Sequence, residues 1–333
     1  MRKGVPTIYT VADDAGVSIA TVSRVERGYK TVSDPTARRV RASMDRVGYR
    51  PNAAARALAM QRHEAIGLVF PHLSGPYYSG VILGLEETAA ARGQALYVVG
   101  TQGRNHADQL VADLSSRVDG LVIAGRTVPD RVIHELERNR LPLVLLARNG
   151  VGGTDAVRSE NRRSAELLTA HLINHGHRAI AFLGDPDSSP DSMERWQGFV
   201  DAQRHVRPVA SMRPVGCAFG EAEGRETAGR LLSGRSRPTA LFCASDEIAM
   251  GAYGAAADLG LRIPADVAVT GWDDIAVARL LMPGLTTVRQ PLREMGAAAA
   301  RLLLERVDAN RQQASTTVLP TEIVIRSSCG CQP

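Results

Sequence analysis

Apolar side chains recur every three or four residues near the start of the chain, in two groups separated by Gly16. A glycine at that place can end a helix in a left-handed conformation, so two short helices joined by a tight turn are expected. The hydroxyls of Thr10 and Ser18 are the candidate caps of these helices. This pattern is typical of a helix-turn-helix, although an ordinary helical hairpin in an enzyme shares it. The apolar positions are Val11, Ala12, Ala15, Val22 and Val25.

A third helix is expected to have Asp34 as its cap and Pro35 as its first residue, and Gly48 is expected to end it. Its apolar face comprises Ala37, Val40, Met44 and Val47. The alanine-rich stretch that follows, at 51–62, has room for about three helical turns, a length that is marginal for an isolated helix in water. We expect this stretch to fold only when docked, the alternative being a plain linker.

From residue 65 onward, short apolar runs alternate with helical segments. Short buried strands separated by helices indicate parallel sheets with helices on both faces. The runs form two groups, split near residue 160, which predicts an α/β core with two doubly wound lobes behind the small all-α head. They lie at 65–70, 95–99, 120–124 and 143–146, and then at 179–183, 240–243 and 267–270.

The excess of positive over negative charge lies in the head of the chain. Residues 1–64 carry 12 lysines and arginines against 6 acidic residues, whereas the remaining residues carry 28 against 29. Any single basic cluster could be a solvated surface. Basic charge that is segregated onto one small domain instead favours contacts with nucleic-acid phosphates.

The cysteines and the N-terminus exclude several other classes. Cys329 and Cys331 form a C-x-C near the end, but no second pair of ligands is evident in the sequence, so free thiols are expected rather than a metal site. His175 and His177 are interpreted as parts of a turn between a helix and a strand. No apolar run approaches the roughly 20 residues of a membrane span, and no apolar stretch follows the charged N-terminus. We therefore expect a cytoplasmic protein.

Four spaced motifs stand out in the head, namely VSIATVSRV at 17–25, VS at 32–33, GYRPN at 48–52 and ARAL at 55–58. Six more follow in the core, namely SGPYY at 74–78, GHRAIA at 176–181, RWQGF at 195–199, SDEIAMG at 245–251, GWDD at 271–274 and LTTVRQP at 285–291. Together these motifs closely resemble the LacI/GalR family of bacterial transcription regulators. The resemblance covers residues 6–328.

This resemblance implies a helix-turn-helix domain at 6–50, a hinge helix or linker at 51–62, and an effector-binding and dimerisation core at 64–328. The core would have the type I periplasmic-binding-protein fold, whose chain crosses between the lobes three times. Lobe 1 would take about 64–160 and 290–318, and lobe 2 about 161–289 and 319–328. No heptad-bearing tail follows the last strand, which favours a dimer over a tetramer.

The resemblance also implies which residues meet DNA. In the major groove, base edges would be read by Ile19, Ala20 and Arg24, of which only Arg24 can donate two hydrogen bonds to guanine. Phosphate contacts that set the register are expected from Tyr9, Ser18, Thr21 and Ser23, with helix packing as the alternative for Thr21. In the hinge, Leu58 would enter a base step from the minor groove and kink the duplex. The residues lining the groove beside it would be Asn52, Ala55 and Arg56.

A cleft between the lobes is expected to bind a small molecule. A sugar needs planar polar partners for adjacent hydroxyls and an aromatic face for its C–H surface. By family position these are Arg195, Asp273 at the end of a strand, and Phe219 as the stacking aromatic. Asp246 is interpreted as a helix cap and Trp272 as core. Weaker effector-binding candidates are Tyr78, Arg148, Asn161, Ser245 and Gln290.

The expected function is a repressor of carbohydrate-utilisation genes that binds a pseudo-palindromic operator as a homodimer and is released by a sugar. A corepressor, such as a purine, or another metabolite remains open. A solute-binding transport protein would share the core fold, but the basic head and the missing signal segment argue against it. An enzyme is not expected, because neither a G-x-x-x-x-G-K phosphate loop nor a G-x-S-x-G nucleophile elbow is present. No cofactor is expected.

Overall fold

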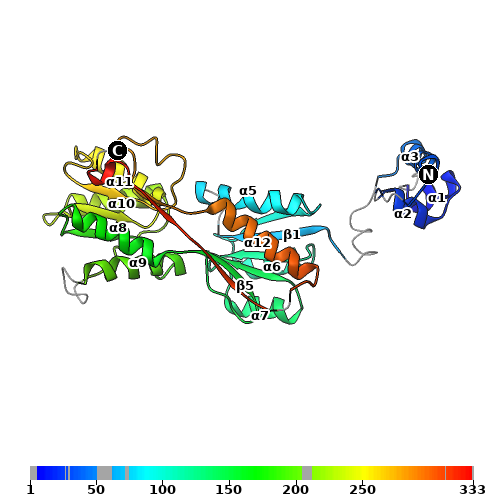
Figure 1. Ribbon diagram of the computed structural model, residues 1–333, viewed down its shortest axis with the longest axis horizontal. Helices are drawn as coiled ribbons and strands as arrows, with labels where there is room; N and C mark the ends of the chain where they lie inside the picture. Colours follow the sequence, from blue (N-terminus) through cyan, green and yellow to red (C-terminus); the bar gives the residue numbers. More distant parts are fainter. Residues whose placement is uncertain are drawn as a thin grey trace. The chain divides into compact units, whose positions relative to one another are not determined.

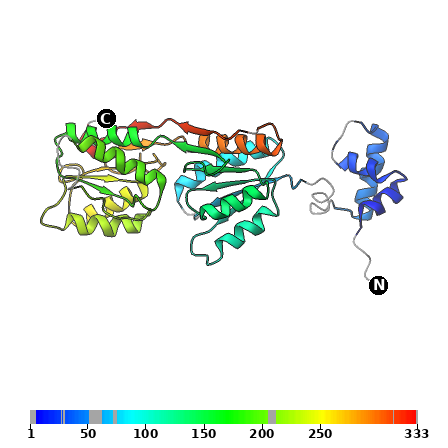
Figure 2. The same cartoon turned by 90° about the horizontal axis from the view of Figure 1, so that it is seen from below.

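The computed structural model describes residues 6–26, 28, 31–50, 62–71, 75–204, 212–311 and 313–331 (Figures 1 and 2). The chain forms two compact units, a head at Met1–His63 and a core at Glu64–Pro333. Within the described residues, no helix combines the length and the apolar character that crossing a bilayer requires.

Three helices build the head, namely α1 (Ile8–Ala15), α2 (Ile19–Glu26) and α3 (Asp34–Val47). Gly16 and Gly48 end α1 and α3 with φ angles of 61° and 71°, a conformation that strains any L side chain. The predicted helix-turn-helix and third helix are thereby confirmed. Their shared core is small and consists of Val11, Ala12, Ala15, Val22, Val25, Ala37 and Val40.

Two of the predicted helix starts are wrong in detail. Thr10 lies inside α1, where its Oγ1 accepts from the backbone N–H of Thr7 at 3.2 Å, and Thr7 is the capping residue. Asp34 is the first residue of α3, and Ser33 takes the cap position before it. Ser18 is confirmed as the cap of α2, since its Oγ accepts a backbone N–H at 3.2 Å. Several neighbouring hydroxyl and carboxylate side chains can take the N-cap position, and the sequence alone does not show which one does.

A polar contact fixes α1 against α3. The carboxylate of Asp14 accepts hydrogen bonds from Ser43 Oγ at 2.6 Å and from Arg46 Nη2 at 2.5 Å. Ser43 is fully buried and also lies 3.3 Å from the carbonyl oxygen of Val11. The Arg46 hydrogen bond, and then that of Ser43, lower the pKa of Asp14. Apolar packing and this ion pair therefore both hold α1 and α3 together, and α2 packs against these two helices.

Lobe 1 of the core contains a six-stranded parallel sheet in the order β10-β5-β4-β3-β1-β2. Helices α5 (Pro76–Ala90) and α12 (Leu292–Val307) cover one face, and α6 (Ala107–Ser115) and α7 (Asp130–Arg138) cover the other. The strands are β1 (Ala65–Phe70), β2 (Ala95–Gly100), β3 (Leu121–Ala124), β4 (Leu143–Leu146), β5 (Asp155–Ser159) and β10 (Thr316–Leu319).

Lobe 2 has a three-stranded parallel sheet in the order β6-β7-β8 and an antiparallel pair, β9 with β11. A single apolar cluster packs four helices on this lobe, with Phe182, Phe242 and Trp272 at its centre. The strands are β6 (Ile180–Leu183), β7 (Ala240–Cys243), β8 (Ala268–Thr270), β9 (Thr287–Arg289) and β11 (Glu322–Val324). The helices are α8 (Arg162–Asn174), α9 (Pro190–Gln203), α10 (Glu221–Leu232), α11 (Asp246–Asp258) and the short η2 (Ser327–Cys329). The predicted α/β architecture with a helical head is confirmed.

The chain passes between the lobes after β5, after β9 and after β10 (Figure 1). Thr321 Oγ1 donates to the carbonyl oxygen of Glu160 at 3.0 Å, and the backbone N–H of Glu160 donates to the carbonyl oxygen of Leu319 at 2.8 Å. The first and third crossings are thus hydrogen-bonded to each other. A change in the angle between the lobes therefore requires backbone changes in the residues of the three crossings.

Helices α5 and α12 lie side by side in lobe 1 at a separation that only glycine permits (Figures 1 and 2). A Cβ on Gly84 of α5 would lie 1.9 Å from the carbonyl oxygen of Arg293. A Cβ on Gly296 of α12 would lie 2.0 Å from the carbonyl oxygen of Val81. Both obstacles are backbone atoms, which cannot move without shifting a helix.

We expect Gly84→Ala to lower the free energy of unfolding of the core by about 1–3 kcal/mol, because the added methyl group forces the two helices apart. Urea unfolding followed by circular dichroism measures this change. Gly229→Ala in α10 is the matched control, since a Cβ there meets its nearest atom only at 4.0 Å. The control should be neutral or stabilising by about 0.5–1 kcal/mol. Equal stability of the Gly84→Ala and wild-type proteins would contradict the close-packing argument.

Candidate DNA-binding surface and effector site

The exposed face of α2 carries the side chains that were predicted to read base edges. Ile19 is 40% exposed, and Ala20 and Arg24 are also exposed. Tyr9, on α1, is 64% exposed. A helix that presents apolar and arginine side chains outward, while valines hold its other face in the core, fits the major groove of DNA.

The predicted phosphate contacts on α2 are partly engaged within the head. Ser18 Oγ lies 3.0 Å from Thr21 Oγ1 in addition to capping the helix. Thr21 and Ser23 are half-buried. The hinge candidates lie outside the described residues. These candidates are Asn52, Ala55, Arg56 and Leu58.

In the core, Arg195 of α9 is buried at the centre of a polar group of side chains. Its Nε donates to Asn161 Oδ1 at 2.9 Å and its Nη1 to the carbonyl oxygen of Ala244 at 2.7 Å. Its Nη2 lies 3.9 Å from Asp191 Oδ2, one helical turn earlier on α9. The guanidinium also stacks over the ring of Trp272, 4.6 Å from the ring centroid. The neighbouring elements therefore fix the orientation of this cation.

Gln290 links this group to both lobes. Its Nε2 donates to Asp273 Oδ1 at 2.6 Å, and its Oε1 accepts from Ser159 Oγ at 2.5 Å. Ser159 ends β5 in lobe 1, whereas Asp273 follows β8 in lobe 2. Asn161 extends the group, because its Nδ2 donates to Asp191 Oδ1 at 3.0 Å. We call Asn161, Asp191, Arg195, Asp273 and Gln290 the effector cluster.

Burial governs the charges of the two carboxyl groups in the effector cluster. It raises the pKa of Asp273 to about 7 and that of Asp191 to about 6, while the positive charge of Arg195 opposes both shifts. Asp273 also has a φ of 118°, and Asp274 a φ of 55°, in a region that non-glycine residues avoid. Strained backbone and perturbed carboxyl groups coincide at functional sites more often than elsewhere.

Two of the remaining predicted effector residues, Tyr78 and Ser245, lie beside this cluster. Burial, and then the negative charges of Glu247 and Asp273, raise the pKa of Tyr78. The Tyr78 ring packs against Phe70, with 4.6 Å between the ring centroids. Ser245 Oγ caps α11 by accepting from the backbone N–H of Ile248 at 3.2 Å. This corrects the assignment of Asp246 as the cap.

Asp246 is the first residue of α11, and its carboxylate accepts from the backbone N–H of Ile275 at 2.9 Å and from Thr287 Oγ1 at 2.6 Å. It joins the loop after β8 to β9, which is a structural role.

Two predicted effector residues make their contacts elsewhere. The guanidinium of Arg148 donates to Asp130 at 2.8 Å and to the carbonyl oxygen of Gly125 at 3.2 Å, within lobe 1. Phe219 lies on the loop before α10 and is 36% exposed. Trp272 is fully buried, as predicted, yet it also carries the guanidinium of Arg195.

Sequence reasoning missed Asp191, Ser159 and Tyr77. Asp191 precedes Arg195 by four residues on one helix, and this spacing was a usable signal. Burial, then the charges of Asp191 and Asp273, raise the pKa of Tyr77, which follows the proline that starts α5. No local pattern marks Ser159, because its role depends on a partner 131 positions away.

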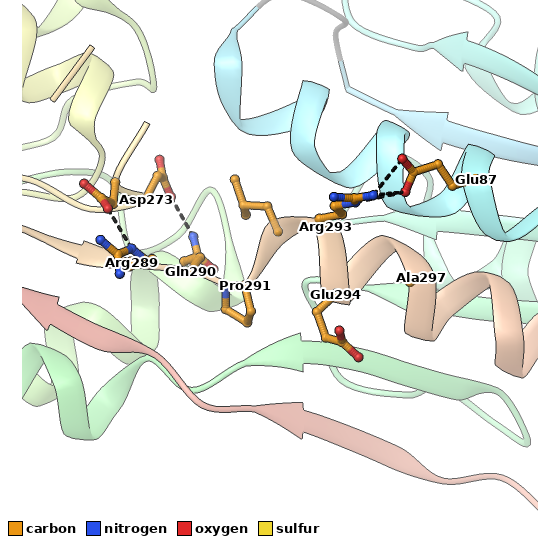
Figure 3. A pocket seen from close by; sticks show the side chains of 10 residues that line it. Glu87, Asp273, Arg289, Gln290, Pro291, Arg293, Glu294 and Ala297 are labelled. Atoms are coloured by element: carbon orange, nitrogen blue, oxygen red, sulfur yellow. Dashed lines mark hydrogen bonds and ion pairs between the residues drawn. The ribbon is translucent and has the colours of Figure 1, made fainter. Parts of the chain in front are cut away.

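An open pocket of about 620 Å³ lies beside the second crossing (Figure 3). Asp273 and Gln290 are at one end of it, and the ion pair of Arg293 with Glu87 is at the other. The other members of the effector cluster do not line this pocket. The pocket therefore exposes one edge of the cluster, while most of the cluster is buried between α9 and the loops after β7 and β8.

Comparison with known proteins relates both units to one family. Residues 7–52 match the model of bacterial regulatory proteins of the lacI family, and residues 169–329 match a periplasmic binding protein-like domain. The HTH-type transcriptional repressor PurR of Proteus mirabilis (strain HI4320) is 33% identical over 335 residues, which cover 98% of each protein.

Solved structures agree with this relationship. A complex of the transcriptional regulator CelR with cellobiose has a TM-score of 0.73 and 29% identity, over 97% of this chain and 99% of that one. The Lac repressor dimer bound to operator and the anti-inducer ONPF has a TM-score of 0.83 and 27% identity, with the same coverage. The helix-turn-helix head, the two-lobed core and these relatives together show that the chain belongs to the LacI family of bacterial regulatory proteins, as a DNA-binding transcriptional repressor and not an enzyme.

Proposed function

We propose that the protein binds a pseudo-palindromic operator as a homodimer and releases it when a small carbohydrate binds between the lobes. The effector cluster is the observation that supports carbohydrate binding. It combines a guanidinium, two carboxyl groups and two amides, which can bind adjacent hydroxyls in pairs. A repressor acts on chromosomal DNA, so the proposal also locates the protein in the cytoplasm.

On the DNA side, Arg24 is the residue proposed to read a guanine, with Ile19 and Ala20 against the groove floor. Ile19 and Ala20 have no side-chain hydrogen-bonding groups and supply shape or a thymine-methyl contact only. Specificity would then depend on Arg24, on the spacing of the two half-sites, and on a kink that Leu58 produces from the minor groove. Tyr9, Ser18, Thr21 and Ser23 would set the register on the phosphates.

The chemistry of the cluster favours a sugar over a purine. Trp272 offers no stacking face to a purine, because it is fully buried and one face of its ring is covered by Arg195, so Phe219 is the aromatic side chain open to either ligand. Carboxylate and amide oxygens, by contrast, accept from sugar hydroxyls, while guanidinium and amide N–H groups donate to them. Phe219 would supply the apolar face. A purine corepressor is the competing outcome.

The segments that cross between the lobes would transmit effector binding to the operator-binding head. Gln290 contacts Ser159 in lobe 1 and Asp273 in lobe 2, so a ligand that engages Asp273 competes with a bond that spans both lobes. Such a ligand prefers one lobe arrangement and shifts the equilibrium by its differential affinity for the two arrangements.

A thermal-shift screen tests the effector half. The full chain is heated with monosaccharides, disaccharides, oligosaccharides and purines, alone and with a duplex that the wild-type protein has selected from a random pool. A sugar that raises the melting temperature and also releases the duplex supports the proposal. A purine that stabilises the protein, with no sugar doing so, would overturn the carbohydrate assignment while leaving DNA binding intact.

Arg24→Ala tests the operator half. We expect about 30- to 10,000-fold weaker binding to the selected duplex, from the loss of two bidentate guanine contacts, one per subunit, with a smaller loss on a scrambled duplex. Fluorescence anisotropy at several salt concentrations measures both affinities. Arg230→Ala in α10 is the control, because Arg230 is an exposed arginine of the core. An unchanged ratio of specific to scrambled affinity would exclude base reading by Arg24.

A further inference from the structure

Four side chains with metal-binding atoms meet where the C-terminal segment returns to α8. His171 lies on α8, and His175 is the residue that follows its last turn, so both rings face the same side. Cys329 and Cys331 come from the end of the chain, more than 150 positions later. The sequence pattern showed no second pair of ligand residues for the C-x-C, but the fold places a pair beside it. The missing pair is a His-x-x-x-His, one helical turn apart.

Three of these side chains have the spacing of a metal site, and the fourth, Cys329, lies beside His171. The ligand atoms of His171, His175 and Cys331 all lie within 4.8 Å of one another. His171 Nε2 is 3.3 Å from Cys329 Sγ and 3.6 Å from Cys331 Sγ, and His175 Nε2 is 3.3 Å from Cys331 Sγ. Tetrahedral zinc, with Zn–N near 2.1 Å and Zn–S near 2.3 Å, places nitrogen and sulfur ligands about 3.6 Å apart. Cys329 Sγ lies outside the group of three, so it has to move closer for all four side chains to bind one ion.

The surrounding structure holds both cysteines in position. Ser328, the fully buried residue before Cys329, donates to the carbonyl oxygen of Val269 at 2.6 Å. Thr286 Oγ1 donates to Cys329 Sγ at 3.1 Å, the kind of outer contact that orients a thiolate ligand. Gly330, with φ of 97°, then turns the chain so that Cys331 faces His175. Only glycine adopts that conformation cheaply.

Hydrogen bonds alone leave this arrangement incompletely explained. A histidine ring nitrogen offers one proton or one lone pair, yet His171 Nε2 lies within reach of two sulfur atoms. One cation at the centre would satisfy both imidazoles and both thiolates at once. Two imidazoles with two thiolates are the donor set of structural zinc sites.

We propose that His171, His175, Cys329 and Cys331 form a structural Zn²⁺ site that fastens the C-terminal segment to α8. All four positions would be protein ligands, so the site would hold the fold together rather than act on a substrate. Zinc binding would stabilise lobe 2, because the unfolded chain does not present the four ligands together.

The test uses the full-length chain, stripped of metal by a chelator under reducing conditions and then titrated with Zn²⁺ or with Co²⁺ as an optical probe. We expect one Zn²⁺ per chain, a higher melting temperature with Zn²⁺, and Co²⁺ spectra with thiolate charge-transfer and tetrahedral d–d bands. His175→Ala and Cys331→Ser remove ligands that are not buried, and each should weaken Zn²⁺ binding by about 100-fold. His177→Ala is the matched control, because His177 pairs with Thr239 at 3.0 Å and should bind zinc as wild type does.

Several results would overturn the site. These are a stripped chain that takes up no Zn²⁺, Co²⁺ spectra without sulfur-to-metal bands, or uptake in His175→Ala and Cys331→Ser equal to that of the control. A disulfide between Cys329 and Cys331 in protein purified under reducing conditions would also do so, since a disulfide sulfur is no thiolate ligand. Circular dichroism of each variant separates lost zinc binding from lost folding.

Discussion

Arg195→Met is expected to abolish the response to the effector and to destabilise lobe 2 by about 3–5 kcal/mol, because it leaves buried partners without their cation. Arg195 is 3% exposed and holds Asn161, the carbonyl oxygen of Ala244 and the ring of Trp272 in place. Asp191, 3.9 Å away, would lose its nearest positive charge. Urea unfolding measures the stability, and operator release on adding the effector measures the response.

A conservative variant separates the two effects. Arg195→Lys keeps the charge but loses the planar fork that donates to two acceptors at once. We expect it to fold with a smaller loss of stability and to bind the effector at least about tenfold more weakly, from one lost charge-assisted hydrogen bond. The control is Arg225→Met, which removes an exposed pair with Asp258 and should change stability by less than about 1 kcal/mol. Wild-type effector affinity in Arg195→Lys would show that the guanidinium does not bind the ligand.

The helical head could be predicted because its determinants are local. Gly16 and Gly48 end helices where the apolar spacing ends, and the core valines recur with the helical period. The caps could not be assigned as reliably, since Thr7 and Thr10, and likewise Ser33 and Asp34, are polar residues near the same helix start that can each take the cap position.

Strand β5 shows why part of the sheet escaped prediction. Its sequence, DAVRS, contains two charged residues, so it has no apolar run. Asp155 is nevertheless fully buried, where it accepts from Arg311 at 3.2 Å and from the backbone N–H of Ser315 at 2.7 Å and pairs with Arg306. These partners lie about 150 positions away, so only the folded chain reveals that the carboxylate can be buried in a strand.

Large separation along the chain also limits the prediction of the sites. Arg195, Asp273, Asn161 and Gln290 were named through family position, and the structure brings all four together. Their assignment to effector binding stays a prediction. His175 was interpreted together with His177 as part of a turn, and His171 was not considered, so the alignment of His171 and His175 with the C-terminal cysteines was missed. Pairs that meet only in three dimensions leave no spacing for a sequence pattern to detect.

Effector affinity is expected to rise between about pH 6 and pH 8, and Asp273→Asn should remove most of that rise. Burial raises the pKa of Asp273 to about 7, so the carboxyl group is largely protonated at pH 6 and ionised at pH 8. Sugar hydroxyls donate more strongly to a carboxylate than to a neutral carboxyl group, so a ligand that contacts Asp273 binds the ionised form better. Isothermal titration calorimetry across this range measures the slope.

Stability should change with pH in the opposite direction. A carboxyl group whose pKa is raised on folding binds its proton more tightly in the folded state, so the free energy of unfolding falls as pH rises from about 4 to about 7. Asp273→Asn removes its own share of that fall, because the amide oxygen can still accept from Gln290 without becoming charged. A smaller slope should remain from Asp191, whose pKa is raised to about 6. Asp258→Asn, which breaks the exposed pair with Arg225 outside the effector cluster, is the control and should keep the wild-type slope of effector affinity. If effector affinity in the wild type were flat from pH 6 to 8, or if Asp273→Asn kept the wild-type slope, Asp273 would not be the carboxylate that binds the effector.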